Sequence, residues 1–416
     1  MRAGKSHLKS GAEQKTASAI RRVSRLNEKV SSKTKKQVKA ECKPFRVEVK
    51  KMLKAGIVGL PNVGKSTLFN ALTSAQNAQS ANYPFCTIEP NVGVVNVPDE
   101  RLYILQDLVK TTVVIPTAIE FVDIAGLVKG ASKGEGLGNQ FLHTIREVDS
   151  IIQVVRCFDD ENTIHVAGKV NPIDDIEIIN MELALADLSS IEKKQARIQK
   201  QVKAGDKDAV LEDKVLKRLV ELLADGKFIN VKEHFEGDEL EVIRGLHLMS
   251  TKPVIYCANV TEFDLKDGNA YTRQVEEYAK SHNAEVVVVS AKIESELAEL
   301  EKEEAEEYLN ELGIEDSGIN RMIKSVYHLL DLRTYITAGE IEVRAWTIPA
   351  GAKAPQAAGV IHTDFEKGFI RAEVTAYKDF VACGSYAACK EKGVTRLEGK
   401  DYEVQDGDIV HFRFAN

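Results

Sequence analysis

The chain has 416 residues, of which 44% are hydrophobic and 29% charged, and its formal net charge is −7. This length is too great for one hydrophobic core and predicts two or three domains. No apolar run reaches the roughly 18 residues that a membrane-spanning helix needs, so the composition is typical of a globular protein and we expect no membrane partner.

The first part of the chain is strongly basic. Residues 1–54 carry 17 Lys and Arg against four Glu, a local charge of +13, so the remaining residues sum to −20. Residues 1–52 are rich in Ser, Lys and Arg and are not expected to fold alone. They fit a transit peptide, which would direct the protein to a plastid rather than a mitochondrion. The alternative is a cytoplasmic protein with a basic arm that contacts RNA; we favour the transit peptide.

A glycine-rich loop follows the first apolar run of the main body. Residues 59–67 read Gly-Leu-Pro-Asn-Val-Gly-Lys-Ser-Thr, which fits G-x-x-x-x-G-K-[ST]. The run 55–58 before it predicts a strand, and the periodic segment 68–72 after it predicts a helix. In this context the N–H groups of the loop and the positive end of the helix bind phosphate oxygens. We therefore predict a nucleotide site, with a tight strand-to-helix turn as the alternative.

Consecutive residues of this loop are expected to contact the nucleotide, namely Asn62, Val63, Gly64, Lys65, Ser66 and Thr67. Lys65 would bridge the outer phosphates, and we predict that it is catalytic because it neutralises charge during phosphoryl transfer. The Ser66 hydroxyl is expected to be a ligand of Mg²⁺.

Two later segments are candidates for sensing the third phosphate. Thr87 lies in a loop bracketed by two prolines, where nucleotide switches place a Thr that ligates Mg²⁺. The predicted strand 118–122 leads into Asp123, whose carboxylate is expected in the Mg²⁺ shell. Gly126 follows, and its N–H is expected to approach the γ-phosphate.

The glycine-rich segment 130–138 is predicted to be the second switch, mobile unless a ligand orders it. Many GTPases place a Gln after the switch glycine to orient the attacking water, but here Leu127 stands in that place. Another group must therefore orient the water, or turnover is slow. The apolar run 151–155 predicts a buried strand, and the loop after it carries His165. From spacing alone, such a histidine is usually solvated.

Residues 176–245 change to a helical period, with a break at residues 205–208. We predict an antiparallel helical hairpin with charged outer faces. It is either a structural insert or an arm that docks on a partner, and the pattern does not favour one over the other. The predicted apolar stripes are Leu188, Ile191, Ile198 and Val202 on the first arm and Leu211, Val215, Leu219 and Leu222 on the second, widened by Leu216, Val220 and Leu223.

The predicted strand 253–258 leads into Asn259, Val260, Thr261 and Glu262. G proteins carry N-K-x-D at this position, where the Asp accepts two hydrogen bonds from guanine. Here the Lys is replaced by Val260 and the Asp by the longer Glu262. We therefore expect weak guanine specificity and admission of adenine.

A further buried strand is predicted at 285–289, and Ser290, Ala291 and Lys292 follow in a loop behind the base. Residues 293–312 are predicted as one Glu-rich helix. From about Leu332 the pattern changes to a small α+β domain. Its predicted strands are 340–348, 359–362, 370–375, 402–404 and 409–414, with a helix at 378–391.

In this order, the phosphate loop, switches, base motif and C-terminal module resemble the Obg-like ATPase (YchF) family of translation-factor-related P-loop NTPases. The resemblance runs from about residue 53 to 416 and leaves residues 1–52 outside. Its most specific blocks are 59–67, 82–90, 121–140, 155–158, 259–262 and 354–370.

The resemblance implies an α/β fold. A Rossmann-like, mostly parallel G domain of the Obg type (53–312) would be interrupted by the helical hairpin and followed by a ubiquitin-like (β-grasp) TGS domain (332–415). It implies Mg²⁺-dependent hydrolysis of ATP rather than GTP and association with the ribosome. It also points to His165 as the catalytic group of a mobile loop, in place of the usual Gln.

Two other functional classes stay open from the residues. One is a GTP-specific Obg-type GTPase, and the other is an RNA- or ribosome-binding module whose shape ATP regulates while hydrolysis is incidental. Asn62 also matches an Asn that coordinates K⁺ in related GTPases, so K⁺ is a candidate second cation. We expect a monomer.

Overall fold

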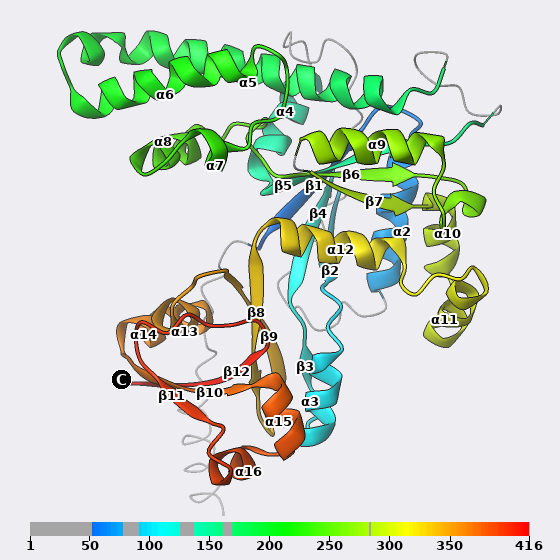
Figure 1. Cartoon of the computed structure of the whole chain (residues 1–416), viewed down its shortest axis with the longest axis vertical. Coiled ribbons are helices and arrows are strands. Elements are labelled where there is room, and N and C mark those ends of the chain that lie inside the picture. The colour runs from blue at the N-terminus through cyan, green and yellow to red at the C-terminus, as the bar shows by residue number, and fades with distance from the viewer. Residues whose placement is uncertain (1–51, 78–90, 125–136, 161–168, 283, 416) are drawn as a thin grey trace, which may run out of the picture. The chain divides into compact units, whose positions relative to one another are not determined.

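The computed structural model describes residues 52–77, 91–124, 137–160, 169–282 and 284–415, which form two β-sheets with their helices (Figure 1). The basic extension and the predicted switch residues Thr87, Gly126 and Leu127 lie outside the described residues. His165 does as well. In the described ranges, no helix is both long and apolar enough to cross a membrane.

The first sheet has the strand order β2-β4-β1-β5-β6-β7. All neighbours from β4 to β7 run parallel, and β2 pairs antiparallel with β4. This is the mostly parallel α/β sheet predicted for the nucleotide-binding domain. Its strands are β1 (Lys54–Gly59), β2 (Val92–Asn96), β4 (Ala118–Asp123), β5 (Ser150–Arg156), β6 (Val254–Asn259) and β7 (Glu285–Val289).

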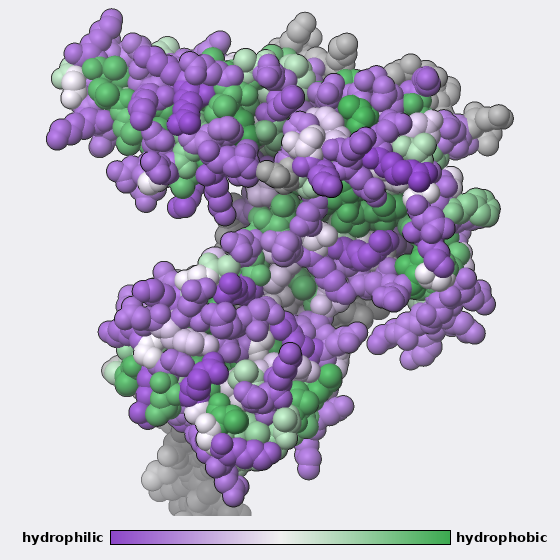
Figure 2. Space-filling view, in the orientation of Figure 1, coloured by the Kyte–Doolittle hydropathy of each residue, from purple (hydrophilic) through white to green (hydrophobic). Residues whose placement is uncertain are grey.

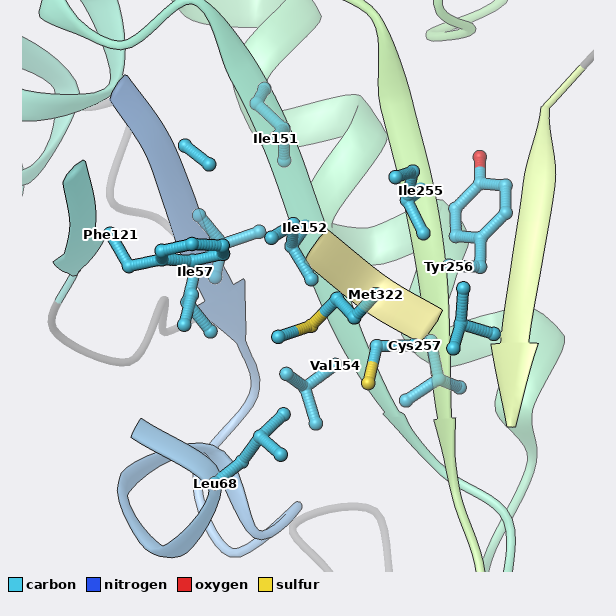
Figure 3. Close-up of a cluster of buried hydrophobic side chains, with 14 of the residues drawn as sticks. Ile57, Leu68, Phe121, Ile151, Ile152, Val154, Ile255, Tyr256, Cys257 and Met322 are labelled. Carbon is cyan, nitrogen blue, oxygen red and sulfur yellow. The ribbon is translucent and has the colours of Figure 1, made fainter. Parts of the chain in front are cut away.

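The central strands are buried on both faces, as continuous apolar runs predict. Every residue of β5 and β6 is buried. Helices α2 (Lys65–Asn77), α9 (Ala270–Ser281) and α12 (Gly318–Leu329) pack on the sheet. Figure 3 shows Met322 of α12 beside Val154 and Cys257, while Leu68 of α2 enters the same core. These contacts hold the carboxyl ends of the parallel strands at one edge.

The predicted hairpin is confirmed, with α5 (Pro172–Lys203) and α6 (Lys207–Leu223) as its arms. The turn lies at 204–206, and Asp206 caps α6 by accepting a hydrogen bond from Ala209 N. Most of the predicted stripe residues pack in one cluster between the arms and α8 (Asp238–Leu246). The hairpin starts four residues earlier than predicted, because Asn171 caps α5 by accepting a hydrogen bond from Asp174 N and Pro172 occupies the first turn. The first half of α5 packs Ile176, Ile179 and Leu183 into the core of the sheet.

A buried carboxylate fixes the root of the hairpin. Asp187 of α5 accepts hydrogen bonds from the backbone N of Met249 and of Ser250, each at 2.8 Å, and from Ser250 Oγ at 2.6 Å. Burial raises the pKa of Asp187, while the hydrogen bonds from Ser250 act in the opposite direction. The three donors thus tie α5 to the segment that enters β6.

The single Glu-rich helix predicted at 293–312 is wrong. The structure has two helices, α10 (Ala291–Leu297) and α11 (Lys302–Glu311), with turns between them. Glu301 precedes α11 in an extended conformation, and its backbone N donates to Glu304 Oε2 at 3.3 Å, which gives the backbone an N-terminal start inside the predicted helix.

The second sheet has the order β11-β10-β12-β8-β9-β3. Strands β8 and β9 form an antiparallel pair, β10 pairs antiparallel with β11 and β12, and β12 lies parallel to β8. A last strand placed centrally beside the first is the β-grasp order expected for a ubiquitin-like domain. The strands are β8 (Leu332–Ala338), β9 (Val343–Pro349), β10 (Phe369–Ala376), β11 (Arg396–Glu398) and β12 (Asp408–Phe414).

Several predicted elements of this domain are wrong. Residues 359–362, predicted as a strand, lie at the end of helix α13 (Ala354–Ile361), which is followed by α14 (Thr363–Lys367). Residues 402–404 contribute one isolated bridge, between Lys353 and Glu403. The strand predicted to begin at 340 begins at Val343, and β8 and β11 were not predicted.

The predicted helix 378–391 is two helices, α15 (Tyr377–Cys383) and α16 (Tyr386–Glu391). Gly384 separates them with a backbone φ of 78°, a left-handed conformation that ends α15.

An early segment of the chain belongs to this second sheet. Strand β3 (Val114–Ile115) pairs parallel with β9, and helix α3 (Arg101–Val109) buries Leu102 and Leu105 against Val343 and Phe380. Arg101 also donates to Asp406 at 2.7 Å. The β-grasp sheet is therefore completed by residues that precede β4 in the chain.

Candidate functional site

The loop between β1 and α2 has the backbone shape of a phosphate-binding loop. Asn62 and Gly64 both have positive φ, 62° and 91°. A Cβ at Gly64 would collide with the side-chain amide of Asn259, so only glycine satisfies both the backbone angle and the contact. Leu68 N donates to Gly64 O at 3.0 Å, which starts the helix directly after the loop.

Asn259 links this loop to the loops that follow β6 and β7. Its Nδ2 donates to Val63 O at 2.9 Å, and its Oδ1 accepts from Ala291 N at 2.9 Å. The side chain is buried, so both hydrogen bonds are shielded from water. Asn259 thereby braces the predicted phosphate side of the site against the predicted base side.

Lys65 and Asp123 meet at the start of α2. The Lys65 ammonium forms an ion pair with Asp123 Oδ1 at the carboxyl end of β4, and Lys65 is only 8% exposed. Ser66 and Thr67 are exposed beside it. The Ser66 hydroxyl and the Asp123 carboxylate are hard oxygen donors, the ligand class that Mg²⁺ takes together with phosphate oxygens. Ser66 and Asp123 are therefore suitable ligands for Mg²⁺.

The described residues contain no group of three or more His, Cys, Asp or Glu that could hold a metal ion. A Mg²⁺ ion at Ser66 and Asp123 would have to complete its shell from nucleotide oxygens and water.

A pocket of about 540 Å³ opens beside the loop, on the side where the base is expected. It is lined by Gly64 and Thr67 from the phosphate loop, by the segment 259–263, and by residues that begin α10. Val260 is buried in its wall, and Phe263 stands at its rim with 85% of its surface exposed. The pocket therefore joins the predicted phosphate and base positions.

Glu262 does not stand free at this pocket. Its Oε2 accepts from Lys292 Nζ at 2.8 Å, and Lys292 also lies 4.0 Å from Glu296. The Glu262 carboxylate raises the pKa of Lys292. Tyr308 of α11 donates to Glu296 at 2.9 Å. Lys292 thus pairs with one oxygen of the Glu262 carboxylate at the edge of the pocket.

Ser290 lies where the pocket meets the start of α10. It is fully buried, and its Oγ has no hydrogen-bond partner among the described residues. Ser290 therefore forms part of the wall of the pocket that it lines.

The described site residues thus gather at one edge of the first sheet. The structure brings together Asn62, Val63, Gly64, Lys65, Ser66, Thr67, Asp123, Asn259, Val260, Glu262, Ser290 and Ala291. The predicted Thr87, Gly126 and His165 lie outside the described residues.

Neither Phe158 nor Lys292 was predicted to contact the nucleotide, although Lys292 was expected in the loop behind the base. Both line the pocket. Phe158 is held by Arg156, whose Nε donates to Phe158 O at 3.1 Å and whose guanidinium lies 4.8 Å from the ring centroid. The position of Lys292 directly after Ala291 was the available signal, but its partner Glu262 is 30 residues away.

Comparison with known families matches both halves of the chain. A family model described as a 50S ribosome-binding GTPase matches residues 54–186. A second model, described as the YchF-GTPase C-terminal domain and as a protein of unknown function, matches residues 332–415.

Comparison with individual proteins covers nearly the whole length of the relatives. The chain is 58% identical over 364 residues to the ribosome-binding ATPase YchF of Bacillus subtilis, covering 87% of this chain and 99% of the relative. It is 56% identical over 361 residues to the protein of the same name from Escherichia coli O157:H7, with the same coverage. A solved structure of the Schizosaccharomyces pombe YchF GTPase matches with a TM-score of 0.77 and 41% identity, covering 88% of this chain and 98% of that one.

Proposed function

This chain belongs to the YchF family, a family of P-loop nucleotide hydrolases, and we propose from that membership that it is an Mg²⁺-dependent ATPase that binds the ribosome. The relatives named above are called ribosome-binding ATPases. The nucleotide would set the conformation of the protein, and hydrolysis would reset it.

The proposal of ATP rather than GTP rests on the contacts of the Glu262 carboxylate. A guanine-specific site needs a carboxylate that is free to accept from guanine N1–H and the exocyclic amine. Here the carboxylate is one methylene longer and is held by Lys292 at 2.8 Å, while Val260 offers no lysine stem for stacking. Guanine would lose its acceptor, whereas adenine requires none at this position. We propose that Asn259, Val260, Glu262, Ser290 and Ala291 form the base side of an adenine site.

On the phosphate side, positioning and charge neutralisation would supply most of the rate enhancement. The Lys65 ammonium would leave Asp123 and bridge the outer phosphates when the nucleotide binds. Ser66, Thr87 and Asp123 would hold Mg²⁺, which supplies charge neutralisation at the phosphates when bound.

The residues that would sense hydrolysis are proposed from the sequence. The Gly126 N–H would hold the γ-phosphate, so loss of that phosphate would release its loop together with Thr87. With Leu127 in the place of the usual Gln, we propose that His165 orients or deprotonates the attacking water.

Single-turnover ATP hydrolysis, measured with and without purified ribosomes, tests this function. We expect slow turnover by the free protein, ATP-dependent cosedimentation with ribosomes, and a change of rate in their presence. ATP hydrolysis by a protein that never sediments with ribosomes would contradict the ribosomal role. Cosedimentation with ribosomes that does not depend on nucleotide would contradict the proposal that the nucleotide sets the conformation of the protein.

We propose that K⁺ is a second cation and that Asn62 contributes to its site. Asn62 adopts a left-handed backbone within the phosphate loop, with φ 62°, which turns the chain where a bound phosphate would lie. Hydrolysis in K⁺ should then be faster than in Na⁺ at the same ionic strength. Equal rates in the two salts would contradict the proposal.

Two further proposals concern the whole chain. Residues 1–52 would be a transit peptide for an organelle, plastid rather than mitochondrion, and sequencing of the mature N-terminus tests this. The working state would be a monomer, which sedimentation equilibrium tests.

A further inference from the structure

The second half of α5 carries an unusual excess of positive charge. Residues 192–203 contain five Lys or Arg and one Glu, although the chain from residue 55 onward has a net charge of −20. Lys193, Arg197 and Lys200 are exposed and occupy positions i, i+4 and i+7 of the helix. These positions lie on one helix face and span roughly 10 Å along its axis.

This cationic stripe, as we call Lys193, Arg197 and Lys200, faces away from the core of the hairpin. The side chains that pack against α6 and α8 are Ile191 and Ile198, which lie on the opposite side of α5. The side of the hairpin in view in Figure 2 is mostly hydrophilic. The stripe is thus presented to solvent on a helix that α6 holds in place.

The two arms of the hairpin use their cations differently. On α6, Lys214 pairs with Glu239 at 2.9 Å, Lys217 pairs with Asp213 at 2.7 Å, and Arg218 lies 5.0 Å from the Phe235 ring centroid. On α5, Lys194 pairs with Glu212 at 3.0 Å.

In contrast, the three residues of the stripe form no ion pair within the described chain. The internal contacts of the hairpin therefore account for Lys194, Lys214, Lys217 and Arg218, but not for the stripe or for Lys207 at the start of α6.

Helix stability does not explain the stripe either. Like charges at i and i+4, such as Lys193 and Arg197, destabilise a helix by a few tenths of a kcal/mol. The helix dipole favours cations only in the last turn, which accounts for Lys200 and Lys203 but not for residues two turns earlier. Helix stability therefore does not account for Lys193 and Arg197.

We propose that the cationic stripe binds the phosphate backbone of RNA. A straight row of three cations on a rigid helix can neutralise neighbouring phosphates of one strand and release their counterions. A membrane surface is the poorer partner, because an interfacial helix inserts an apolar face and the apolar face of α5 is covered by α6 and α8. This inference rests on the proposed ribosomal role and assigns part of that contact to ribosomal RNA.

The test compares two variants of the full chain. The stripe variant is Lys193→Gln, Arg197→Gln and Lys200→Gln, since Gln keeps helix propensity and removes the charge. The matched control is Lys214→Gln with Lys217→Gln, which removes charge from α6. Binding to a fluorescent A-form RNA hairpin and to purified ribosomes is measured over a series of KCl concentrations.

We expect the stripe variant to bind both probes on the order of tenfold more weakly at moderate salt. Its slope of log K against log[KCl] should be smaller by about two units. The control variant should keep the affinity and slope of the unmodified protein. Replacing Lys193 and Lys200 by Arg should preserve binding, because the charge is retained.

Unchanged affinity and slope in the stripe variant, with ribosome binding intact, would overturn this inference and leave the proposed function standing. An unmodified protein that binds no ribosomes would instead contradict the proposed function. Stripe-dependent binding to phosphatidylglycerol vesicles without stripe-dependent RNA binding would also overturn the inference.

Discussion

The sheet that contains β1 is parallel from β4 to β7, whereas the sheet that contains β12 mixes parallel and antiparallel pairs. In the first sheet, parallel strands place Gly59, Asp123 and Asn259 at the same edge, because each residue ends its strand. Open parallel sheets bind ligands at this edge. The second sheet carries ion pairs at its surface, such as those of Glu373 with Lys390 and Arg413.

The two sheets should therefore respond differently to substitution. Removing a polar group at the carboxyl edge of the first sheet should reduce hydrolysis with little loss of folding stability. Removing a charge from the second sheet should reduce stability and leave hydrolysis unchanged. Variants in each sheet test whether the two sheets differ in this way.

The largest effect is expected for Lys65→Ala. Loss of the ammonium removes the charge that neutralises the outer phosphates, so kcat/KM for ATP should fall by at least about a hundredfold. Phosphate release measures this. Lys54→Ala is the control, because Lys54 lies at the other end of β1, where it pairs with Glu120 at 2.8 Å. Comparable turnover in the Lys65 variant and the unmodified protein would refute the proposed role.

A large but more selective effect is expected for His165→Ala. If His165 orients or deprotonates the water, kcat should fall about a hundredfold while the affinity for ATP changes little. Single-turnover rates and ATP titrations separate the two quantities. The control is His328→Ala, an exposed histidine that pairs with Glu285 at 2.8 Å. A parallel loss of ATP affinity would indicate a binding role instead.

The smallest effect is expected in the second sheet, for Glu373→Gln. Glu373 of β10 pairs with Lys390 and Arg413, each at 2.9 Å, and these partners lower its pKa to about 2. Because the pKa is lowered on folding, the stabilisation is present above the ordinary value near 4.5 and is lost as the pH falls towards 2.

At pH 7 the Glu373 variant should lose about 0.5–1 kcal/mol of unfolding free energy and keep its ATP turnover. Urea unfolding measured from pH 7 down to pH 2 should show the difference from the unmodified chain shrinking with acidity. Glu391→Gln serves as the control, since Glu391 is exposed on α16. A difference that is independent of pH would show that packing, rather than charge, is responsible.

The two sheets also differ in how well the sequence predicts them. Buried parallel strands such as β6 give continuous apolar runs, and the motif residue Asn259 marks where the strand ends. In the second sheet, the short apolar run 359–362 fits a strand or a helix equally well. The helix is favoured by residues that precede this run, namely Pro355 in the first turn of α13 and Gln356, whose Oε1 accepts a hydrogen bond from Lys353 N at 2.8 Å.

Contacts between distant residues were beyond prediction. Nothing local indicates that β3 joins β9, since this pairing links Val114 to Val343. The phosphate loop and the departure at Glu262 could be identified because motifs fix residue types at fixed spacing. The pairing of Glu262 with Lys292 could not be predicted from the sequence, because it requires β6 and β7 to lie side by side.

Calorimetric titration of the unmodified protein with Mg²⁺-ATP and with Mg²⁺-GTP tests the central claim most directly. If the carboxyl edge of the first sheet forms an adenine site, ATP should give a clear binding heat and an affinity at least about tenfold higher than that of GTP. Tight binding of GTP with no heat from ATP would contradict the account.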